Sequence, residues 1–393
     1  MANVSDVRTT ANILAARLPV DMADKIAILD ASKNPFLTFL KNIKKDARVV
    51  YNPKFNWLED ALLGNYTLKN GANASTSDTS MVVDDGSIFR NYDIVKNMTT
   101  GEVMLVTGVT TNTLTVVRGY GSSSAANVGN DDEFLIIGNA QEENADGRAV
   151  KSTQEADCYN YTQIFRTPIS LSGTEAASKL YGGKDRGYQR MKAGIEHARD
   201  IAYSMYFGEK KLDTTNTNTV RRTMGGVVEF LTTASQTQAF AANGTHLNYA
   251  NFDSLVAQKV FTYGSSEKLL ICGPKLAAMV NSWAMSDLIT NVKEETYGMN
   301  VKKLMTSYGV MNVVYDPILA TNTVSAGYGF VIDLDKVRYA YLDGRDTKLR
   351  TEIQDADVDG LVDEYLTECS LELKNGKCHM LLTGCYNPGT TES

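Results

Sequence analysis

The sequence contains few of the residues that carry most enzyme and metal chemistry. Three histidines occur in 393 residues, and none lies near a nucleophile motif. The five cysteines form no CxxC pair, and their odd number argues against a disulfide framework. The spacing of Cys378 and His379 from Cys369 and Cys385 fits no common zinc module. We expect the thiols to be buried on strands. The remaining two are Cys158 and Cys272.

Long apolar runs are also absent. No stretch of the chain approaches the roughly 18 residues that a membrane helix needs. Segment 1–20 has neither the basic region nor the hydrophobic core of a secretory signal, so we expect a protein that is cytosolic when made. No GxGxxG follows an expected strand and no GxxxxGK[ST] occurs, which argues against a nucleotide site.

A net charge of −7 argues against a free nucleic-acid binder, because neutralising phosphates requires a basic face. The one basic cluster contains Lys41, Lys44, Lys45 and Arg48. We expect it to be a solvated helix face, or to contact nucleic acid if this segment lines an enclosed space. With 43% hydrophobic and 22% charged residues, the composition is that of a globular chain, and its length indicates two or three domains.

The acidic stretch DADVDG resembles the start of an EF-hand calcium loop. Such a loop has ligands at positions 1, 3, 5, 7, 9 and 12 and a glycine at position 6. Asp355, Asp357 and Asp359 match the first three positions. Gly360 matches the glycine, and Asp363 falls at position 9.

The ligand that would close this loop is missing. Position 12 is Leu366, and Glu364 comes two places too early. Both flanks alternate as strands do, where an EF-hand has helices. We therefore favour an acidic turn between two antiparallel strands, with Gly360 at a positive φ, over a cation site at the three aspartates.

The beginning of the chain, 1–49, is expected to be an arm. Helical periodicity is interrupted at Asn34-Pro35, where a new turn can begin. An arm of this kind has no core of its own. We therefore expect Phe36, Phe39 and Trp57 to be buried on the surface of neighbouring copies of the chain.

Short alternating strands follow between about 76 and 140. Glu102–Thr107 and Thr113–Arg118 flank a turn rich in Thr and Asn, and this pattern predicts a hairpin. Close spacing of such strands predicts a small β-barrel or sandwich. It would be inserted between two extended limbs, at about 50–75 and 140–165.

The clearest helix is predicted at about 186–207. Asp185 is available as its N-cap and Gly208 as its C-terminal stop. His197 lies off the apolar stripe of this helix, so we expect it on the surface. The stripe consists of Tyr188, Met191, Ile195, Ala198, Ala202 and Met205.

The remaining chain alternates between helices and strands and then ends in strands. From 223 to about 330 the pattern is that of an α/β domain, with a helix beginning near Pro274. The segment 331–393 predicts strands joined by turns, and Asn375-Gly376 is a strong hairpin signal. There is no internal repeat of 20–50 residues.

This order of segments resembles the major capsid proteins of tailed bacteriophages, which have the Hong Kong 97 type of fold. It is most similar to the branch with a β-domain insertion in the extended loop. Each block alone is weak, because none carries chemistry, but they run in the expected order over nearly the whole chain. The blocks are NPFLTFLKNI, LTVVRGYGSS, NYTQIFRTPISLSGT, RRTMGGVVEFL and LTECSLELKNGKCHMLLTGCY.

The resemblance implies an α+β capsid fold and names its parts. The parts are an N-terminal arm at 1–49, an extended loop at 50–165 with a small β-barrel insertion at about 76–140, a peripheral (P) domain with a long spine helix at 166–222, an axial (A) domain at 223–330, and the return strands of the P domain with the C-terminus at 331–393.

The resemblance also implies a structural protein. Its copies would form the pentamers and hexamers of an icosahedral head shell, which encloses double-stranded DNA but contacts it weakly. Expected partners are other copies of the chain, a scaffolding protein, a portal, and cement or decoration proteins. The protein would be assembled in the cytoplasm of a bacterial host and would reside in the virion. No catalytic residue, cofactor, metal or membrane is expected.

Three other functions remain open. An enzyme could use a carboxylate pair, but adjacent residues point apart and solvated charge explains each pair. A calcium-stabilised adhesin would need a secretion route that the sequence does not indicate. An encapsulin-like shell without DNA is disfavoured by the β insertion and the phage blocks. The carboxylate pairs are Asp84-Asp85, Glu142-Glu143 and Glu294-Glu295.

Overall fold

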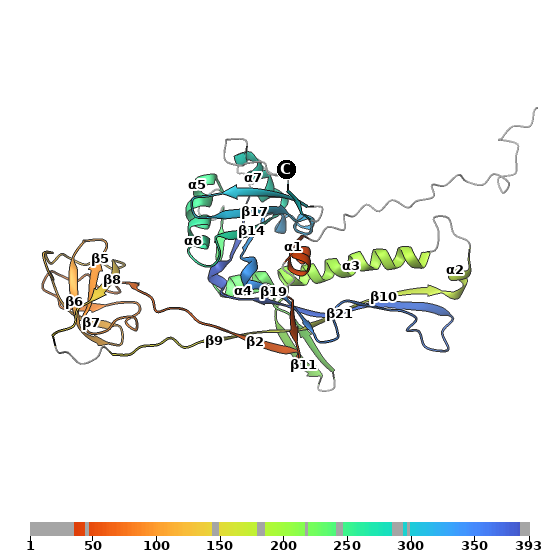
Figure 1. Ribbon diagram of the computed structural model, residues 1–393, viewed down its shortest axis with the longest axis horizontal. Helices are drawn as coiled ribbons and strands as arrows, with labels where there is room; N and C mark the ends of the chain where they lie inside the picture. The colour runs from red at the N-terminus through yellow and green to blue at the C-terminus, as the bar shows by residue number, and fades with distance from the viewer. Residues whose placement is uncertain are drawn as a thin grey trace, which may run out of the picture. The chain divides into compact units, whose positions relative to one another are not determined.

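The chain forms two compact units in the computed structural model (Figure 1). The first consists of Met1–Trp57 with Cys158–Ser393, and the second of Leu58–Asp157. No helix among the described residues is long and apolar enough to cross a membrane. The structure describes residues 35–43, 47–143, 149–178, 185–216, 219–240, 247–284, 294–296 and 299–385.

The second unit is a six-stranded β-barrel. Its strands run in the order β3-β8-β5-β6-β7-β4. The ends of the sheet meet where the Asn70 amide donates to the Val82 carbonyl and the Asp84 amide donates to the Leu68 carbonyl. This closure confirms the predicted small barrel and leaves no long free edge. The strands are β3 (Tyr66–Leu68), β4 (Ser80–Val82), β5 (Asp93–Asn97), β6 (Val103–Thr110), β7 (Thr113–Val117) and β8 (Glu133–Asn139).

Alternation of side chains builds the barrel core. In β7, Leu114 and Val116 are buried, while Thr115 between them is exposed. The predicted hairpin is confirmed, since β6 pairs antiparallel with β7. The barrel begins at Tyr66, earlier than the expected residue 76, because β3 is needed to pair with β8. Other core residues are Met81, Phe89, Val95, Met104, Val106 and Phe134.

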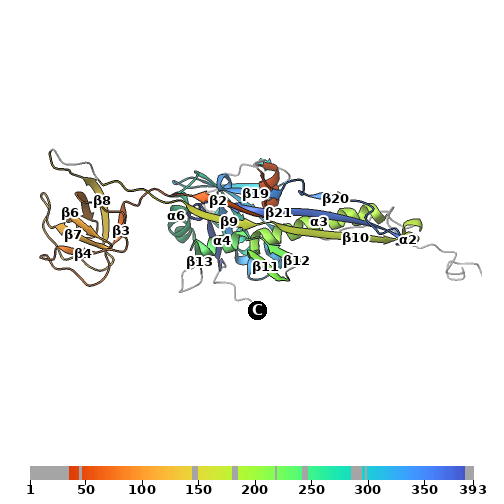
Figure 2. The ribbon, with the colours of Figure 1, turned by 90° about the horizontal axis from the view of Figure 1, so that it is seen from below.

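The first unit contains two sheets. One has the order β1-β19-β21-β10, and β20 pairs with β21 beyond the end of β19. The helix α3 lies along β10 and β21 (Figure 2). Two strand pairs, β2-β9 and β11-β12, stand apart from this sheet. The strands are β1 (Arg48–Val50), β2 (Lys54–Glu59), β9 (Ala156–Tyr161), β10 (Gln163–Ser172), β11 (Lys211–Asn216), β12 (Thr219–Thr223), β19 (Val337–Leu342), β20 (Lys348–Arg350) and β21 (Gly360–Leu373).

The other sheet forms the predicted α/β part. Its strands run in the order β13-β22-β18-β14-β17-β16-β15, with β14 parallel to β17 and antiparallel to β18. The helix predicted near Pro274 begins there as α7. The strands are β13 (Thr237–Ala239), β14 (Glu267–Cys272), β15 (Glu294–Thr296), β16 (Met299–Met305), β17 (Val310–Tyr315), β18 (Gly329–Ile332) and β22 (Met380–Thr383).

Helices of this unit cover the sheets and connect their strands. A continuous helical stretch is made of α5, the π-helical segment η5 and α6. The helices are α1 (Pro35–Thr38) with η3 (Phe39–Ile43), α2 (Gly173–Ala177), α3 (Asp185–Phe207), α4 (Val227–Thr233), α5 (Tyr249–Phe252), η5 (Asp253–Ala257), α6 (Gln258–Phe261) and α7 (Pro274–Ala284), with short 3-10 turns η6 (Pro317–Thr321), η7 (Ser325–Gly327), η8 (Leu334–Lys336) and η9 (Gly376–Cys378).

The hairpin predicted at Asn375-Gly376 is wrong. Asn375 does adopt a left-handed conformation, with φ of 52°, as a turn residue should. The flanking strands, however, belong to different sheets: β21 pairs with β19, whereas β22 pairs with β18 and β13. The expected segment 331–393 therefore divides between the two sheets. Local turn chemistry specified the bend but not the partner of the strand that follows it.

The aromatic residues of the arm are buried within the chain itself. Phe36 is fully buried and stacks on Tyr206, with ring centroids 5.0 Å apart. Phe39 joins the same core, and Trp57 packs 5.9 Å from Phe230. The expected burial of these side chains on neighbouring copies is wrong, because α3 and α4 of the same unit supply the surface. The helix expected before Pro35 lies outside the described residues.

The long helix ends where the sequence predicted, but its buried face differs. α3 ends at Phe207, just before Gly208. Its buried residues are Ala193, His197, Ile201, Ala202, Met205 and Tyr206. The predicted stripe is therefore right at Ala202 and Met205 and wrong at Met191, whose residue is 50% exposed. The surface position expected for His197 is also wrong, since only 2% of this residue is exposed.

Gly208 gives a direct test of how α3 ends. A Cβ at this position would lie 2.4 Å from the Ser204 carbonyl oxygen and 2.6 Å from the Met224 carbonyl oxygen. Both are backbone atoms, so Gly208→Ala should lower the melting temperature by several degrees. The matched control is Gly187→Ala in the same helix, where a Cβ meets nothing within 4 Å. This control should be neutral or stabilise by up to about 1 kcal/mol. Equal melting temperatures for the two variants would contradict the described end of the helix.

Candidate assembly site

Three glutamates lie on one face of β21 and are almost completely buried. Glu364, Glu368 and Glu372 are spaced by four residues, so their side chains project from the same side of the strand. Their side chains are 3%, 2% and 0% exposed. A buried carboxylate is costly unless a cation compensates it. The rest of this face must therefore supply cations.

Arginines from distant segments provide these cations. Arg48 of β1 contacts Glu372 with an Nη1–Oε2 distance of 2.6 Å. Arg345, after β19, contacts Glu368 with an Nε–Oε2 distance of 2.5 Å. The other partners are Arg222 of β12 for Glu368, Arg166 of β10 for Glu364, and Lys374 for Glu372. We call the three glutamates and these cations the glutamate ladder.

The opposite face of β21 holds a second buried carboxylate site. Arg186 donates to Asp363 through Nε and Nη2, with both distances 2.9 Å, and Arg190 donates through Nε at 2.8 Å. The side chain of Asp363 is 2% exposed. The hydrogen bonds from Arg186 hold the pKa of this carboxyl well below its usual range, and those from Arg190 add to the effect. Two arginines from α3 thus fix the helix against the strand.

The acidic stretch forms the turn that we favoured. It connects β20 to β21, which pair antiparallel. Asp363, the residue at calcium position 9, already accepts hydrogen bonds from two arginines, which argues against a cation there. The predicted positive φ at Gly360 is wrong. Glu352 has φ of 57° instead, so the sharp backbone change occurs at the start of the connection.

His197 of α3 is buried against β10 and β21. Its Nδ1 lies 2.9 Å from the Thr167 hydroxyl and its Nε2 lies 2.7 Å from the Thr367 hydroxyl. Its ring stacks on Tyr365 with centroids 5.9 Å apart. Burial lowers the pKa of His197, so the neutral imidazole is favoured. His197 therefore makes a polar contact between the helix and the sheet.

Most of the cysteines are buried, and so is a second histidine, His379. All five cysteines are free, and four of them are buried, while Cys158 is half-buried. Both ring nitrogens of His379 are used: Nδ1 accepts from the Asp333 amide at 3.0 Å, and Nε2 lies 3.1 Å from the Lys374 carbonyl. Burial lowers the pKa of His379 to about 4. The described residues contain no cluster of three or more possible metal ligands.

The basic cluster is not a freely solvated face where the structure describes it. The Lys41 ammonium lies 3.2 Å from Asp346 Oδ1 and 4.3 Å from the centre of the Tyr339 ring. Arg48 belongs to the glutamate ladder. Both cations therefore hold the arm to the sheet. Lys44 and Lys45 lie outside the described residues.

The carboxylate pairs considered for catalysis have separate surroundings. Asp84 accepts a hydrogen bond from Asn70, whereas Asp85 accepts one from the Ser87 amide. Glu142 and Glu143 are exposed. Glu294 and Glu295 are successive residues of β15, and their side chains lie outside the described part of the structure.

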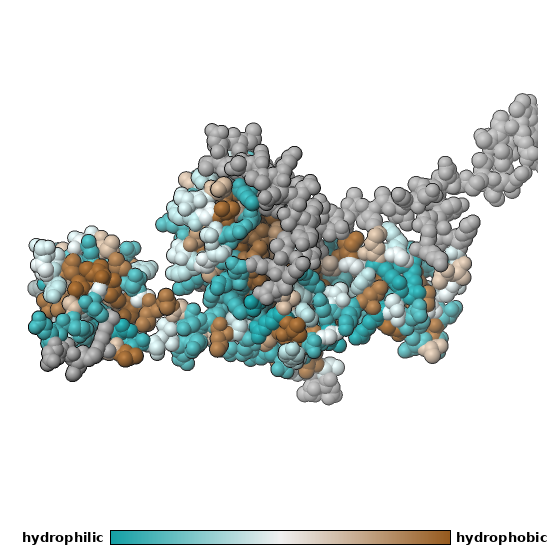
Figure 3. Space-filling view, in the orientation of Figure 1, coloured by the Kyte–Doolittle hydropathy of each residue, from teal (hydrophilic) through white to brown (hydrophobic). Residues whose placement is uncertain are grey.

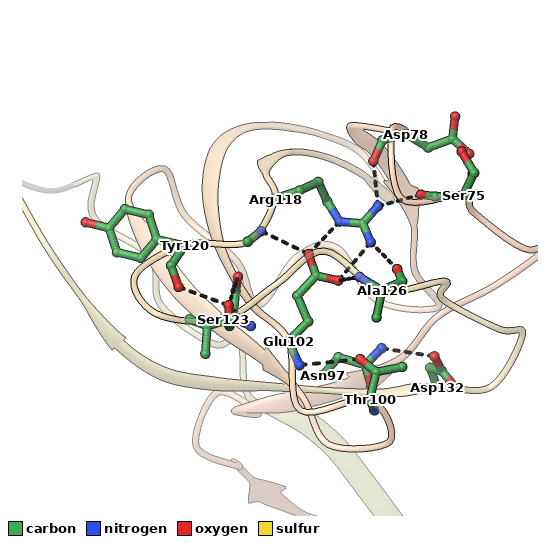
Figure 4. Close-up of polar contacts among 12 residues, drawn as sticks. Ser75, Asp78, Asn97, Thr100, Glu102, Arg118, Tyr120, Ser123, Ala126 and Asp132 are labelled. Carbon is green, nitrogen blue, oxygen red and sulfur yellow. Dashed lines mark hydrogen bonds and ion pairs between the residues drawn. The ribbon is translucent and has the colours of Figure 1, made fainter.

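The barrel has its own buried ion pair (Figure 4). The side chains of Arg118 and Glu102 are 6% and 0% exposed, and Arg118 Nε donates to Glu102 Oε1 at 2.7 Å. Arg118 also donates to the carbonyls of Ser75, Asp78 and Ala126. Glu102 accepts from the Gly119 and Ala126 amides, both at 3.0 Å. One ion pair thus joins several loops of the barrel.

An open groove lies on the face of the sheet that carries the glutamate ladder. Its volume is about 740 Å³. Ile164 is paired with Glu368 and Arg166 with Leu366, which places the β10 side of the groove beside the ladder. The lining residues are Thr162, Ile164 and Arg166 at β10 and Asp213, Thr215, Thr219, Val220, Arg221 and Arg222 of the β11-β12 hairpin.

Comparison with known proteins identifies the family. The sequence model of the SU10 major capsid protein family matches residues 3–386. The chain belongs to this family of phage major capsid proteins. A major capsid protein of Pseudomonas phage PaMx41 is 25% identical over 289 residues, which is 71% of this chain and 68% of that protein.

Solved structures add information about the fold of this capsid protein. The capsid of cyanophage A-1(L) has a TM-score of 0.52 at 11% identity, covering 96% of this chain and 100% of that one. This likeness supports the α+β Hong Kong 97 type of fold that the sequence predicted. An encapsulin from Synechococcus elongatus has a TM-score of 0.41 at 9% identity, covering 62% of this chain and 80% of that one, too weak a likeness to bear on function.

The Asp363 site predicts a stability loss in acid. Because the folded protein lowers this pKa, the stabilisation is complete above the unfolded-state pKa of about 3.9 and is lost as pH falls below it. Asp363→Asn should lower the melting temperature near pH 7 and reduce its dependence on pH between about 5 and 2. Asp343→Asn, at an exposed residue, is the control. Parallel pH profiles for wild type and Asp363→Asn would show that the ion pair does not stabilise the fold.

The barrel ion pair predicts a large effect of a single truncation. Arg118→Ala leaves Glu102 buried without its cation, which should cost about 3–5 kcal/mol. Calorimetry of the capsid protein should show a transition at markedly lower temperature. The control is Lys192→Ala, whose partner Glu196 is 3.9 Å away and 44% exposed, so its effect should stay within about 0.5 kcal/mol. Equal effects of the two truncations would refute the role of burial.

Proposed function

We propose that this capsid protein self-assembles into the pentamers and hexamers of an icosahedral phage head that encloses double-stranded DNA. The observation that carries the proposal is the family match over residues 3–386, which spans both compact units. Rings of identical subunits require a heterologous contact, in which two different surfaces of the subunit meet. The subunit must therefore present at least two complementary surfaces.

Exposed apolar side chains support an assembling subunit. Leu62 is 98% exposed and Val150 is 95% exposed, and both lie in the proposed limbs of the extended loop. Tyr51 is 78% exposed at the start of the same loop. Figure 3 also shows hydrophobic residues gathered on the visible face of the barrel. Exposed apolar surface of this kind is typical of interaction sites, and a neighbouring subunit would cover it in the shell.

The parts of the chain have proposed roles in such a shell. The extended loop, 50–165, would lie over a neighbouring subunit and contain the barrel as an insertion. The spine helix α3 with β10 and β21 would form the P domain, and the α/β sheet would form the A domain near the capsomer centre. The family match and the fold likeness support this assignment.

The charge and the family of the protein also suggest how it contacts DNA and which partners it has. A net charge of −7 favours weak contact with packaged DNA, because strong binding would require a basic surface. We expect a scaffolding protein, a portal and cement or decoration proteins as partners, and assembly in the cytoplasm of a bacterial host. A purely structural role, without catalysis, agrees with relatives that are structural capsid proteins.

The test is electron microscopy of the purified protein, alone and after co-expression with a scaffolding protein. We expect closed shells or flat hexamer sheets in at least one condition. Sedimentation velocity gives the fraction assembled and provides a control for aggregation. A monodisperse monomer under both conditions would contradict the proposal.

A further inference from the structure

The groove beside the glutamate ladder has a cationic and partly apolar lining. The buried carboxylates Glu364 and Glu368 lie beneath their arginines, since the side chain of Arg166 is 62% exposed while that of Glu364 is 3% exposed. Arg221 is also exposed, and the half-buried Asp213, which is paired with Arg221 in the hairpin, adds one carboxylate to a lining with three arginines. The positive ends of these pairs therefore face the solvent, and the negative ends do not. Ile164 and Val220, 45% and 52% exposed, add apolar surface to the same groove.

The acidic turn between β20 and β21, residues 351–359, has the complementary character. Asp355, Asp357 and Asp359 are exposed, and no lysine or arginine within the described ranges forms an ion pair with them. Ile353 and Val358 of the same turn are 41% and 50% exposed. Unpaired carboxylates beside exposed aliphatic side chains match a lining of arginines beside Ile164 and Val220. The complementarity is thus both electrostatic and apolar.

The turn is already shaped by its own backbone. The Ile353 amide donates to the Val362 carbonyl at 2.9 Å, and the Val358 amide donates to the Asp355 carbonyl at 3.1 Å. At the base of the turn, Glu352 lies 3.2 Å from Arg186. A segment held in this way loses little conformational entropy when it binds.

We propose that the groove between β10 and the β11-β12 hairpin receives the acidic turn 351–359 of a second copy of the chain. The inference rests on the proposed function, because it describes one contact within the shell. The two surfaces are different parts of the same unit, so the contact is heterologous. A heterologous contact generates a ring when its rotation closes, as pentamers and hexamers require. Exposed charges favour the correct partner and orientation, while the apolar contacts supply affinity.

Charge reversal tests the contact. Arg221→Glu places a negative charge in the groove, and Asp355→Lys with Asp357→Lys places positive charges in the turn. Each change creates repulsion between copies, so each should raise the protein concentration needed for assembly by about tenfold or more. The combination in one chain should restore assembly, because every copy then offers a reversed groove and a reversed turn. Arg166 and Arg222 are left unchanged, since the buried Glu364 and Glu368 would each lose a cation.

Matched controls separate the contact from general effects of charge. Lys211→Glu changes the same hairpin at an exposed residue that does not line the groove, and Asp343→Lys changes an exposed aspartate outside the turn. Both should assemble as wild type does. Melting temperatures of all variants should agree within a few degrees, because each substituted side chain is exposed. A variant that melts much lower is replaced by the neutral change Arg221→Gln or Asp357→Asn, for which a smaller loss is expected.

The outcomes distinguish the inference from the proposed function. If wild type assembles and the combined variant does not recover, the turn and the groove do not meet. Normal assembly of Arg221→Glu would also overturn the inference. If the turn variant fails only in the presence of the scaffolding protein, the turn binds that protein and the inference is wrong. Failure of wild type itself to assemble would contradict the proposed function instead.

Discussion

A carboxylate in the interior of a protein is costly unless cations replace the water that it has lost. Glu364, Glu368 and Glu372 meet this condition through arginines that come from β1, β10, β12 and the turn after β19. Each arginine is far from its partner in sequence, so these segments must be in place together. Removing Arg166 would leave Glu364 buried without its cation, which costs several kcal/mol. The positions of the arm and of the β11-β12 hairpin therefore depend on ion pairs with β21.

The two faces of β21 have different surroundings. On one face the ladder keeps carboxylates inward and guanidinium groups outward, which gives the surface a positive character without a basic net charge. On the other face Cys369, Leu371 and Leu373 enter the main core, and His197 connects α3 to the sheet through two threonines. If such a strand shifted its pairing by one residue, its glutamates would enter the hydrophobic core and its apolar side chains would take the place of the glutamates. Its register is therefore strongly fixed.

The barrel has a buried ion pair of its own, which depends on no described residue of the other unit. Glu102 and Arg118 satisfy one another and several backbone groups, so its loops are held by contacts that lie within Leu58–Asp157. A unit of this kind can be carried on an extended loop without relying on the other unit for its core. Its outer surface still exposes apolar residues, which include Tyr66, Met98, Val117 and Ile137.

Local patterns in the sequence determined the elements whose partners are nearby. The β6-β7 hairpin, the end of α3 before Gly208 and the acidic turn before β21 all follow from alternation, periodicity and turn residues within about ten positions. The order of such elements was also sufficient to indicate the capsid fold. Only the tertiary structure decided that Phe36 stacks on Tyr206, that His197 is buried, that β22 leaves the sheet of β21, and that Asp363 belongs to two arginines. The physical reason is that burial and ion pairing depend on residues far away in the chain, whose arrival at a given place no local pattern records.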